Sequence, residues 1–245
     1  MLHISIKAEP IFNILGLHIT NSLLSSLIVL LIFLIVSHFF SENMSGKRSK
    51  GVVLILFMID SLYSLFNSIL KDKTRKFFPL LASFFLFILL SNWFGLIPGV
   101  GSITIKESSA NSIEKQVPLL RGATADLNTT IAIALISVVL IQYYGIAYLG
   151  FKGYVTKFIN LTNPLNFFVG ILDIVSELSK IISFAFRLFG NIFAGEVLLV
   201  VIAFLIPILA SFPFLLLEIF VGFIQALVFS MLTAIFINVA IIKHD

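Results

Sequence analysis

The sequence predicts an all-α integral membrane protein, and three observations support that fold class. Of its 245 residues, 59% are hydrophobic and 11% are charged, whereas a soluble domain carries about 25% charged residues. The mean hydropathy is +1.12. Several apolar stretches also reach about 20 residues, the length with which an α-helix crosses about 30 Å of hydrocarbon. We therefore expect a single membrane domain over residues 1–245, with a lipid bilayer as its main solvent.

Composition also excludes several other classes of protein. The chain has no cysteine, so disulfides, thiolate metal sites and cysteine nucleophiles are ruled out. Its net charge of +4 comes from basic residues in loops beside apolar stretches, where the positive-inside rule explains them without nucleic acid. The "GKRS" that begins at Gly46 lacks the upstream glycine and following Ser/Thr of a phosphate-binding loop. We expect no nucleic-acid partner, no bound nucleotide, no cofactor and no metal.

The apolar stretches predict the helices in chain order. The expected elements are an outer segment at 1–18, crossing helices at 19–40, 77–97 and 125–149, an outer loop at 98–124, and two long helices at 164–206 and 214–242. A helix of about 40 residues would extend about 60 Å, twice the hydrocarbon thickness. Tilt must absorb that mismatch, so we expect the last two helices to form a long, steeply inclined hairpin around a turn from Pro207 to Pro213.

The stretch at 51–70 is long enough to cross, but its polar residues favour another position. Asp60, Ser64 and Asn67 recur at helical spacing along one stripe. Basic residues flank the stretch on both sides: Lys47, Arg48 and Lys50 before it, and Lys71, Lys73, Arg75 and Lys76 after it. If both flanks obey the positive-inside rule, this segment is a cytoplasmic interfacial helix. Five crossings then place the N-terminus outside and the C-terminus inside.

The stretch at 164–206 is unusual because it combines high hydropathy with ionisable residues. At about 100° per residue, one face within about 80° of Arg187 holds Asp173, Glu177, Lys180, Ser183 and Asn191. Glu196 lies on the opposite side, about 13 Å further along the axis. Asp173, Glu177 and Lys180 could equally form an ion-pair strip at the wet cytoplasmic end of the helix, without a further function.

Arg187 is harder to explain by structure alone. An arginine at membrane depth costs a few kcal/mol even on the lenient insertion scale. Its guanidinium stays protonated, so it attracts a carboxylate and repels a migrating proton. A carboxyl group in lipid stays neutral, whereas the same group beside a permanent cation ionises. An arginine that faces a moving carboxylate would therefore force it to release its proton.

Glu196 and Glu218 are expected at similar depth toward the outer side, on the two arms of the hairpin. We expect Glu196 to face the helix of Glu218. Gln225 lies two turns beyond Glu218 on the same helical face, near the level of Arg187. Polar groups would then descend from the outside toward the arginine, as an aqueous proton path requires. The alternative is that these side chains only hold the helices together by hydrogen bonds.

Four segments resemble subunit a of the F-type ATP synthase, of the bacterial type. They are "ADLNTTIAIAL" (125–135), "NPLNFFVGILDIVSELSK" (163–180), "FRLFGNIFAGE" (186–196) and "LEIFVGFIQALVFSMLTAIFI" (217–237). The resemblance covers most of residues 75–242. It implies a stator in the membrane Fo sector, pressed against a rotating c-subunit ring and joined to the b-subunit peripheral stalk.

The resemblance also implies roles for single residues. Arg187 matches the essential arginine that separates two offset half-channels leading to the c-ring carboxylate. The residues that match its neighbours or the proton entry path are Ser183, Asn191, Glu196, Glu218 and Gln225. Ion flow would thereby be coupled to rotary ATP synthesis or hydrolysis. The isolated chain is then no enzyme, since chemistry on ATP belongs to other subunits.

Two further positions keep two readings. Asp126 and Asn128 match a polar patch of the outer half-channel, but alone they would be capping residues after an outer loop.

Mitochondrial relatives usually carry histidine where this chain has Glu196. The resemblance therefore favours a bacterial plasma membrane, with the mitochondrial inner membrane as the alternative. The coupling ion, proton or sodium, depends mostly on the c-ring carboxylate.

Two rival functions give different expectations. A self-contained ion-coupled transporter or channel would use Arg187 to bind a substrate anion, but such folds often show internal repeats and broken helices in matching halves. This sequence shows neither. A purely structural assembly protein would not need Arg187.

Overall fold

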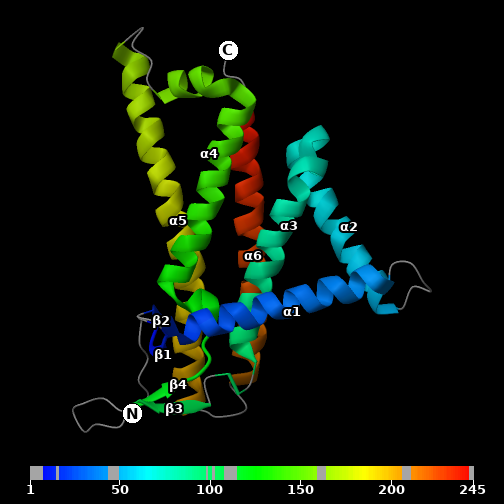
Figure 1. The fold of residues 1–245 in the computed structure, drawn as a ribbon, viewed down its shortest axis with the longest axis vertical. Helices are drawn as coiled ribbons and strands as arrows, with labels where there is room; N and C mark the ends of the chain where they lie inside the picture. Colours follow the sequence, from blue (N-terminus) through cyan, green and yellow to red (C-terminus); the bar gives the residue numbers. More distant parts are fainter. Residues whose placement is uncertain are drawn as a thin grey trace.

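The computed structural model describes residues 8–14, 17–43, 50–97, 99–100, 103–107, 115–158, 164–205 and 211–242, which form a helical bundle (Figure 1). The helices are α1 (Asn21–Asn43), α2 (Lys50–Leu70), α3 (Thr74–Leu96), α4 (Leu127–Phe158), α5 (Pro164–Leu205) and α6 (Ser211–Ile241). Short 3-10 turns η1 (Lys71–Lys73) and η2 (Ala123–Ala125) precede α3 and α4. Two antiparallel hairpins complete the fold: β1 (Pro10–Ile14) with β2 (Leu17–Thr20), and β3 (Thr104–Glu107) with β4 (Lys115–Pro118).

The described residues contain five segments long and apolar enough to cross a membrane. They are Asn21–Glu42, Gly51–Leu96, Leu127–Thr156, Leu165–Leu205 and Ser211–Ile241. The predicted class, an all-α membrane protein, is thereby confirmed. The second of these segments contains both α2 and α3. Which of α1 and α2 crosses the bilayer, and which lies at its surface, therefore stays a prediction.

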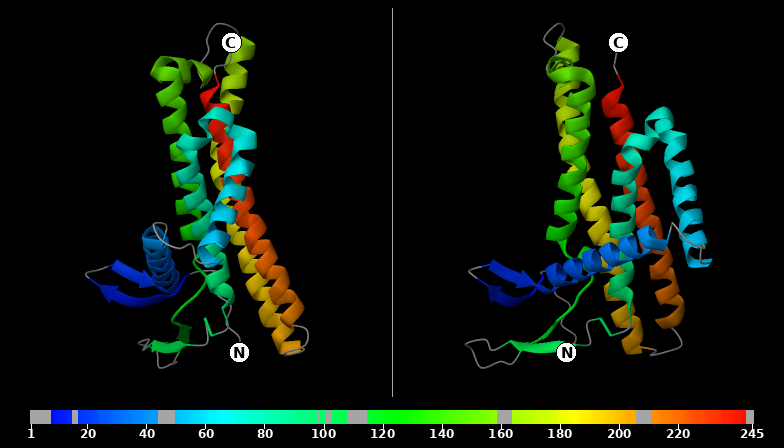
Figure 2. Two further views of the ribbon diagram at one scale, coloured as in Figure 1. Left: turned by 90° about the vertical axis from the view of Figure 1, so that its right-hand side faces the viewer. Right: turned by 45° about the vertical axis from the view of Figure 1, so that its right-hand side comes forward.

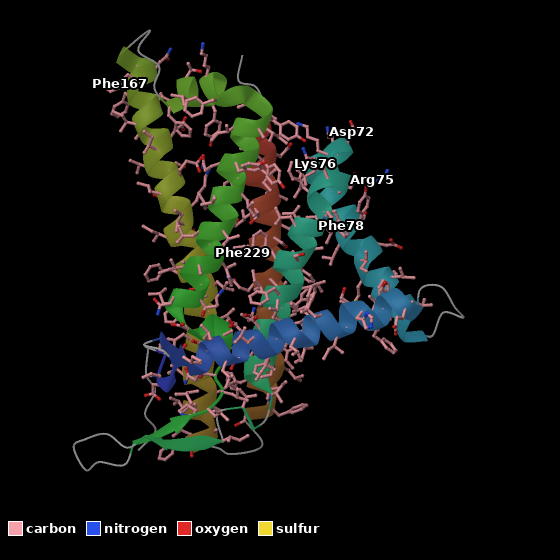
Figure 3. The ribbon with its side chains drawn as sticks, in the orientation of Figure 1. Asp72, Arg75, Lys76, Phe78, Phe167 and Phe229 are labelled. Atoms are coloured by element: carbon pink, nitrogen blue, oxygen red, sulfur yellow. The ribbon has the colours of Figure 1, made fainter. Side chains whose placement is uncertain are left out.

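The bundle has two chemically different ends. One end holds β3 and β4, the last residues of α5 and the first residues of α6; we call it the hairpin end (Figure 1). The other holds η1 with Lys71 and Lys73, and we call it the basic end. Figure 3 shows Asp72, Arg75 and Lys76 at this same end. The fold thus gathers the basic residues that follow α2 on one side.

Helices α1 and α2 run in different directions relative to the bundle. Helix α1 lies across the bundle rather than along it, and α2 runs beside α3 (Figures 1 and 2). Among the α1 side chains that the structure describes, the buried ones belong to its first turns: Asn21, Ser22, Ser25 and Val29. Those of α2 that join the core are Leu62, Phe66 and Leu70. The first turns of α1 are therefore packed against the bundle, and these contacts determine the angle at which the helix crosses it.

The core lies where α3, α5 and α6 meet. Phe229 of α6 lies at its centre (Figure 3), with ring centroids of Phe184 and Phe84 at 4.8 and 5.7 Å. In lipid this packing relies on van der Waals contact, because lipid tails are as apolar as the side chains themselves. A polar pair lies within the same layer: the hydroxyls of Ser137 on α4 and Thr233 on α6 are 3.0 Å apart and buried.

Helix α4 breaks at Gly150, one residue after the expected helix end at 149. The φ of Gly150 is 74°, in the left-handed region that glycine adopts without a Cβ clash. Beyond it the chain turns toward α5 and stays helical to Phe158, where a loop was expected (Figure 1). The turn brings the Tyr154 ring against Gly145, where an added Cβ would clash with it.

Helices α5 and α6 form the long antiparallel pair. Helix α5 spans 42 residues without interruption, close to the expected range of 164–206. Helix α6 begins at Ser211, three residues before the expected 214, because the first turn of a helix tolerates Pro213. Their hairpin-end halves lie side by side and lean away from α4 (Figure 2). Residues 206–210 of the expected turn lie outside the described residues.

Candidate functional site

Arg187 lies near the middle of α5, at the border between the core and the exposed surface of that helix. Its neighbours Phe184 and Ala185 are buried, whereas Phe186 is exposed. The half-buried guanidinium donates a hydrogen bond from Nη2 to Ser183 Oγ at 3.2 Å, one turn earlier. Across the ranges that the structure describes, no carboxylate forms an ion pair with Arg187. A permanent positive charge therefore lies beside the exposed face of α5.

Asn191 links this strip of α5 to α6. Its Nδ2 donates a 2.8 Å hydrogen bond to Gln225 Oε1. Asn191 is one turn beyond Arg187, so Ser183, Arg187 and Asn191 share one face of the helix. The Gln225 side chain is 4% exposed. The bond to Asn191 holds Gln225 one helical turn from the level of Arg187, near the depth expected from the sequence.

Glu218 lies in a buried notch between α6 and α5. Its side chain is 6% exposed, and its carboxylate packs against Gly195, where an added Cβ would clash with it. One turn further along α6, the carbonyl of Gly222 accepts a 3.0 Å hydrogen bond from Asn92 Nδ2 of α3. Asn92 Oδ1 in turn accepts a 2.7 Å bond from the Thr124 hydroxyl. The buried side of α6 near the hairpin end is therefore lined by polar groups.

The sequence predicted that Glu196 faces the helix of Glu218, and the ion pair that the structure gives it is with Arg121: Nη2 of the arginine lies 3.2 Å from Glu196 Oε2. The residue of α5 that contacts Glu218 is Gly195. Neighbouring helical positions point about 100° apart, so Gly195 and Glu196 present different sides of α5. The two carboxylates share a level of the hairpin but lie on different sides of α5.

Arg121 was not among the site residues predicted from the sequence, yet its side chain is 7% exposed. Its guanidinium carbon lies 6.0 Å from the centroid of the Phe193 ring. Its backbone N–H donates a 3.2 Å hydrogen bond to Ser25 Oγ of α1. The only local signal in the sequence is that Arg121 precedes a segment of small residues, Gly-Ala-Thr-Ala at 122–125, which the structure buries.

Asp126 has the contacts of a helix cap. Its Oδ1 accepts a 3.3 Å bond from the backbone N–H of Asn128, and its Oδ2 accepts one from the Thr129 hydroxyl at 3.3 Å. The same Oδ2 accepts a 3.0 Å bond from Ser22 Oγ of α1. Asp126 is buried, whereas Asn128 is exposed. The capping reading therefore has geometric support, and a place of either residue in an ion path stays a prediction.

Replacement of Asp126 by alanine should lower the free energy of unfolding by about 1 to 2 kcal/mol, the usual effect of losing an N-terminal helix cap. The loss of the bond to Ser22 should keep the effect at the upper end of that range. The thermal midpoint of the purified protein in detergent measures it. Asn128→Ala is the matched control and should change the midpoint little, because that side chain is exposed. Equal midpoints for Asp126→Ala and wild type would contradict the capping role.

A second polar cluster lies toward the basic end, between α4 and α5. Lys180 Nζ lies 2.6 Å from Glu177 Oε1, so this pair of the expected ion-pair strip does form. Glu177 Oε2 accepts a 2.6 Å hydrogen bond from Gln142 Nε2, and Gln142 Oε1 accepts one from the Tyr154 hydroxyl. A cleft of about 450 Å³ lies beside them. Gln142 and Tyr154 were not foreseen, because the sequence pattern did not predict the helical turn toward α5 that follows the kink at Gly150.

Fold and site together define a class of protein: a multi-pass membrane protein with a strip of ionisable and amide side chains inside an inclined helical hairpin. The family model described as "ATP synthase A chain" matches residues 23–238. The chain therefore belongs to the ATP synthase A chain family. Membership assigns it to the membrane Fo sector of ATP synthase, where it takes part in proton transport within a multi-subunit complex.

Relatives with that function are similar over most of the chain. "ATP synthase subunit a" of Moorella thermoacetica is 30% identical over 233 residues, covering 95% of this chain and 95% of that protein. The protein of the same name from Baumannia cicadellinicola is 34% identical and covers 99% of this chain and 88% of its own length. That from Gloeobacter violaceus is 36% identical over 179 residues, or 73% of this chain and 66% of that protein.

Proposed function

We propose that this chain is the ion-conducting stator of the ATP synthase, with Arg187 between two half-channels that open to opposite sides of the membrane. Each half-channel delivers ions to a carboxylate on a rotating c-subunit ring. The observation that supports this most strongly is the position of Arg187. Its charge lies beside an exposed apolar face of α5, and no described carboxylate of its own chain pairs with it.

The electrostatic step follows from the permanent charge of the guanidinium. A c-ring carboxyl in lipid stays protonated, because desolvation disfavours its charged form. When it reaches Arg187 it ionises and releases its proton into one half-channel. It takes up a proton from the other half-channel before it returns to lipid. Because Arg187 repels a proton, it also prevents direct leakage between the half-channels.

The hairpin end is proposed as the outer side, where protons enter. Glu218 and Gln225 are buried along one face of α6, and Asn191 bonds to Gln225 one turn from Arg187. This order gives a line of groups that exchange or orient protons between the outer water and the arginine. The other proposed members of the route are Ser183, Glu196, Asp126 and Asn128.

The partners follow from the exposed faces. A long apolar surface of α5 includes Phe167, Leu178, Ile182 and Phe186, each at least 43% exposed. We propose that the c-ring covers the part of this surface near Arg187 and that lipid covers the rest. The b-subunit peripheral stalk is the proposed partner that stops this chain from turning with the ring. Glu196 at its position favours the bacterial plasma membrane as the location.

Replacement of the c-subunit carboxylate by its amide distinguishes this function from that of a self-contained channel. Vesicles containing the complex without its ATPase sector should conduct protons with the wild-type c subunit and fail to conduct with the amide variant. Both complexes must contain the same amount of this chain, measured by gel. Unchanged conduction with the amide variant would favour a self-contained channel within this chain.

Replacement of Gly195 by alanine should slow proton conduction while leaving the fold intact. The added methyl group would clash with the Glu218 carboxylate, which is the end of a flexible side chain and can move away. Conduction should fall several-fold with an unchanged thermal midpoint. Gly190→Ala is the matched control on the same helix, because nothing lies within 4 Å of its added Cβ. Wild-type conduction by Gly195→Ala would show that the position of Glu218 is unimportant.

A further inference from the structure

Two neighbouring side chains of α3 donate hydrogen bonds to the main chain of α6. Asn92 Nδ2 lies 3.0 Å from the carbonyl oxygen of Gly222, and Trp93 Nε1 lies 3.1 Å from that of Ile219. These two carbonyls are about one helical turn apart. Inside a helix a carbonyl accepts the N–H four positions further on and keeps a second lone pair. The side chains of α3 therefore bind α6 without interrupting it, and α6 is continuous from Ser211 to Ile241.

The α3 side of this contact is held in place by the segment before α4. Asn92 Oδ1 accepts a 2.7 Å bond from the Thr124 hydroxyl, so both ends of the Asn92 amide are bonded and its orientation is fixed. A Cβ added at Gly95 of α3 would lie 3.0 Å from the Gly122 Cα, so α3 and this segment are in close contact. On the α6 side, a Cβ added at Gly222 would lie 3.1 Å from Asn92 Cβ. The two helices therefore approach closely where the bonds form.

The bonded part of α6 carries two side chains of the proposed proton route. Glu218 directly precedes Ile219, and Gln225 lies three residues beyond Gly222. The Glu218 carboxylate occupies the space that a side chain at Gly195 of α5 would take. A shift of α6 by one residue would move Glu218 by about 1.5 Å along the axis and turn it by about 100°, out of this space. The site therefore depends on where α6 lies along its axis and how it is rotated.

Apolar packing alone determines that position weakly. Lipid tails are as apolar as the side chains of α6, so burial against another helix offers little advantage over contact with lipid. A hydrogen bond to a main-chain carbonyl is directional and fixes one point of the helix. The bonds at Ile219 and Gly222 fix two points about one turn apart, and together they oppose both sliding and rotation of α6 beside Glu218.

We propose that Asn92 and Trp93 are positioning residues of the outer half-channel. They hold α6 so that Glu218 lies in the notch at Gly195 and Gln225 lies within hydrogen-bond distance of Asn191. Neither residue exchanges a proton, and both act through the side chains of α6. The inference rests on the proposed function and adds to it the residues of α3 that determine the geometry of the route.

Proton conduction by the complete membrane sector in vesicles tests this role. Trp93→Phe removes the donor but keeps an aromatic ring, and Asn92→Leu removes the donor with little change in size. Each should lower conduction about threefold, the factor that corresponds to an average hydrogen bond between membrane helices, and the double variant close to tenfold. When Glu218→Gln is already present, the same double change should cause a much smaller loss, because the two effects are coupled.

Two controls separate this role from a general effect on stability. Thr124→Val removes the bond to Asn92 Oδ1 but leaves the donor to Gly222, and it should retain more conduction than Asn92→Leu. Asn238→Leu removes a comparable bond, to the Ile69 carbonyl, at the far end of α6, and it should conduct almost as well as wild type.

The position of α6 is measured separately with introduced cysteines, because the chain has none of its own. Gly195→Cys combined with Glu218→Cys should form a disulfide on mild oxidation, since the two side chains occupy the same space. Asn92→Leu with Trp93→Phe should lower the yield several-fold, whereas Asn238→Leu should leave it nearly unchanged. If the cysteine pair forms no disulfide in the otherwise wild-type chain, the conduction cycle with Glu218→Gln decides.

Three results would overturn the inference: wild-type conduction by the double variant, an equal loss in Asn238→Leu, or the same fold loss with and without Glu218→Gln. If the double variant fails to assemble, Trp93→Phe alone decides. Trp93 is 38% exposed, so its replacement by a smaller ring leaves no buried cavity. A threefold loss in that variant would support the role, and wild-type conduction would overturn it.

Arg187→Ala in the same vesicles distinguishes failure of this inference from failure of the proposed function. If Arg187→Ala is blocked while the double variant of α3 conducts normally, only the role of Asn92 and Trp93 is wrong. If Arg187→Ala pumps normally, the proposed function fails, and the cysteine yield still shows whether α3 holds α6 in position.

Discussion

Replacement of Arg187 by alanine should abolish ATP-driven proton pumping while the complex remains assembled. Without the permanent cation, nothing on α5 would force a protonated c-ring carboxyl to release its proton. The side chain donates one described hydrogen bond, to Ser183 within its own helix, so its loss removes no described hydrogen bond between helices. Pumping is measured as acidification of inverted vesicles on addition of ATP, and assembly as the amount of each subunit in the purified complex.

Arg187→Lys is the stricter variant and should also fail. An ammonium loses its proton more readily on burial than a guanidinium, and it lacks the planar, rigid set of donors. Ser183→Ala is the matched control, since it removes the hydrogen bond to Arg187 but keeps the charge. That control should retain most of the pumping. Normal pumping by Arg187→Ala in an assembled complex would disprove the stator mechanism proposed above.

Local periodicity explains why much of the site could be predicted from the sequence. Ser183, Arg187 and Asn191 are four residues apart, so any uninterrupted helix through them must place them on one face. No proline lies between Pro164 and Pro207 to interrupt the helix, and α5 accordingly runs from Pro164 to Leu205. The depth of a residue in α5 or α6 likewise follows from the number of residues between it and the turn that joins the two helices. This count placed Gln225 near Arg187, and the bond to Asn191 agrees with it.

Contacts between distant segments explain what could not be predicted. Arg121 and Glu196 are 75 positions apart, and no periodicity relates a loop residue to one side of a helix. The helical angle of Glu196 excluded the Arg187 face, but it could not decide between α6 and the loop. In the structure Gly195 contacts the Glu218 carboxylate of α6, whereas Glu196 pairs with Arg121. The Gln142 and Tyr154 contacts near Glu177 depend in the same way on the kink at Gly150.

The direction of α1 has a similar cause. Hydropathy described its 19–40 stretch correctly as apolar, but hydropathy does not set an angle. Ser22 bonds to Asp126 and Asn21 to the Pro118 carbonyl, so polar contacts fix the first turn of the helix against the loop and α4. Such buried hydrogen bonds are strongly favoured where water is excluded. They therefore outweigh the weak orientational preference of a uniformly apolar helix.

Replacement of Glu218 by glutamine should slow proton conduction by about tenfold to a hundredfold, within or just below the usual contribution of a positioned proton-transfer group. Glutamine has the same shape and fits the notch against Gly195, but its amide cannot take up and release a proton at this position. Some conduction should remain, because water can bridge part of the distance between the outer side and Gln225. The rate of passive proton uptake into vesicles measures the effect.

Two controls make the Glu218 result specific. Glu218→Asp retains an exchanging carboxyl one methylene shorter and should conduct far better than Glu218→Gln. Glu196→Gln makes the same chemical change at the same level of the hairpin, on a carboxylate already paired with Arg121, and should have the smaller effect. Larger loss in Glu196→Gln than in Glu218→Gln would reverse the assignment, because the ion-paired group would then be the carrier. Wild-type conduction by both variants and by their double variant would remove both carboxylates from the route.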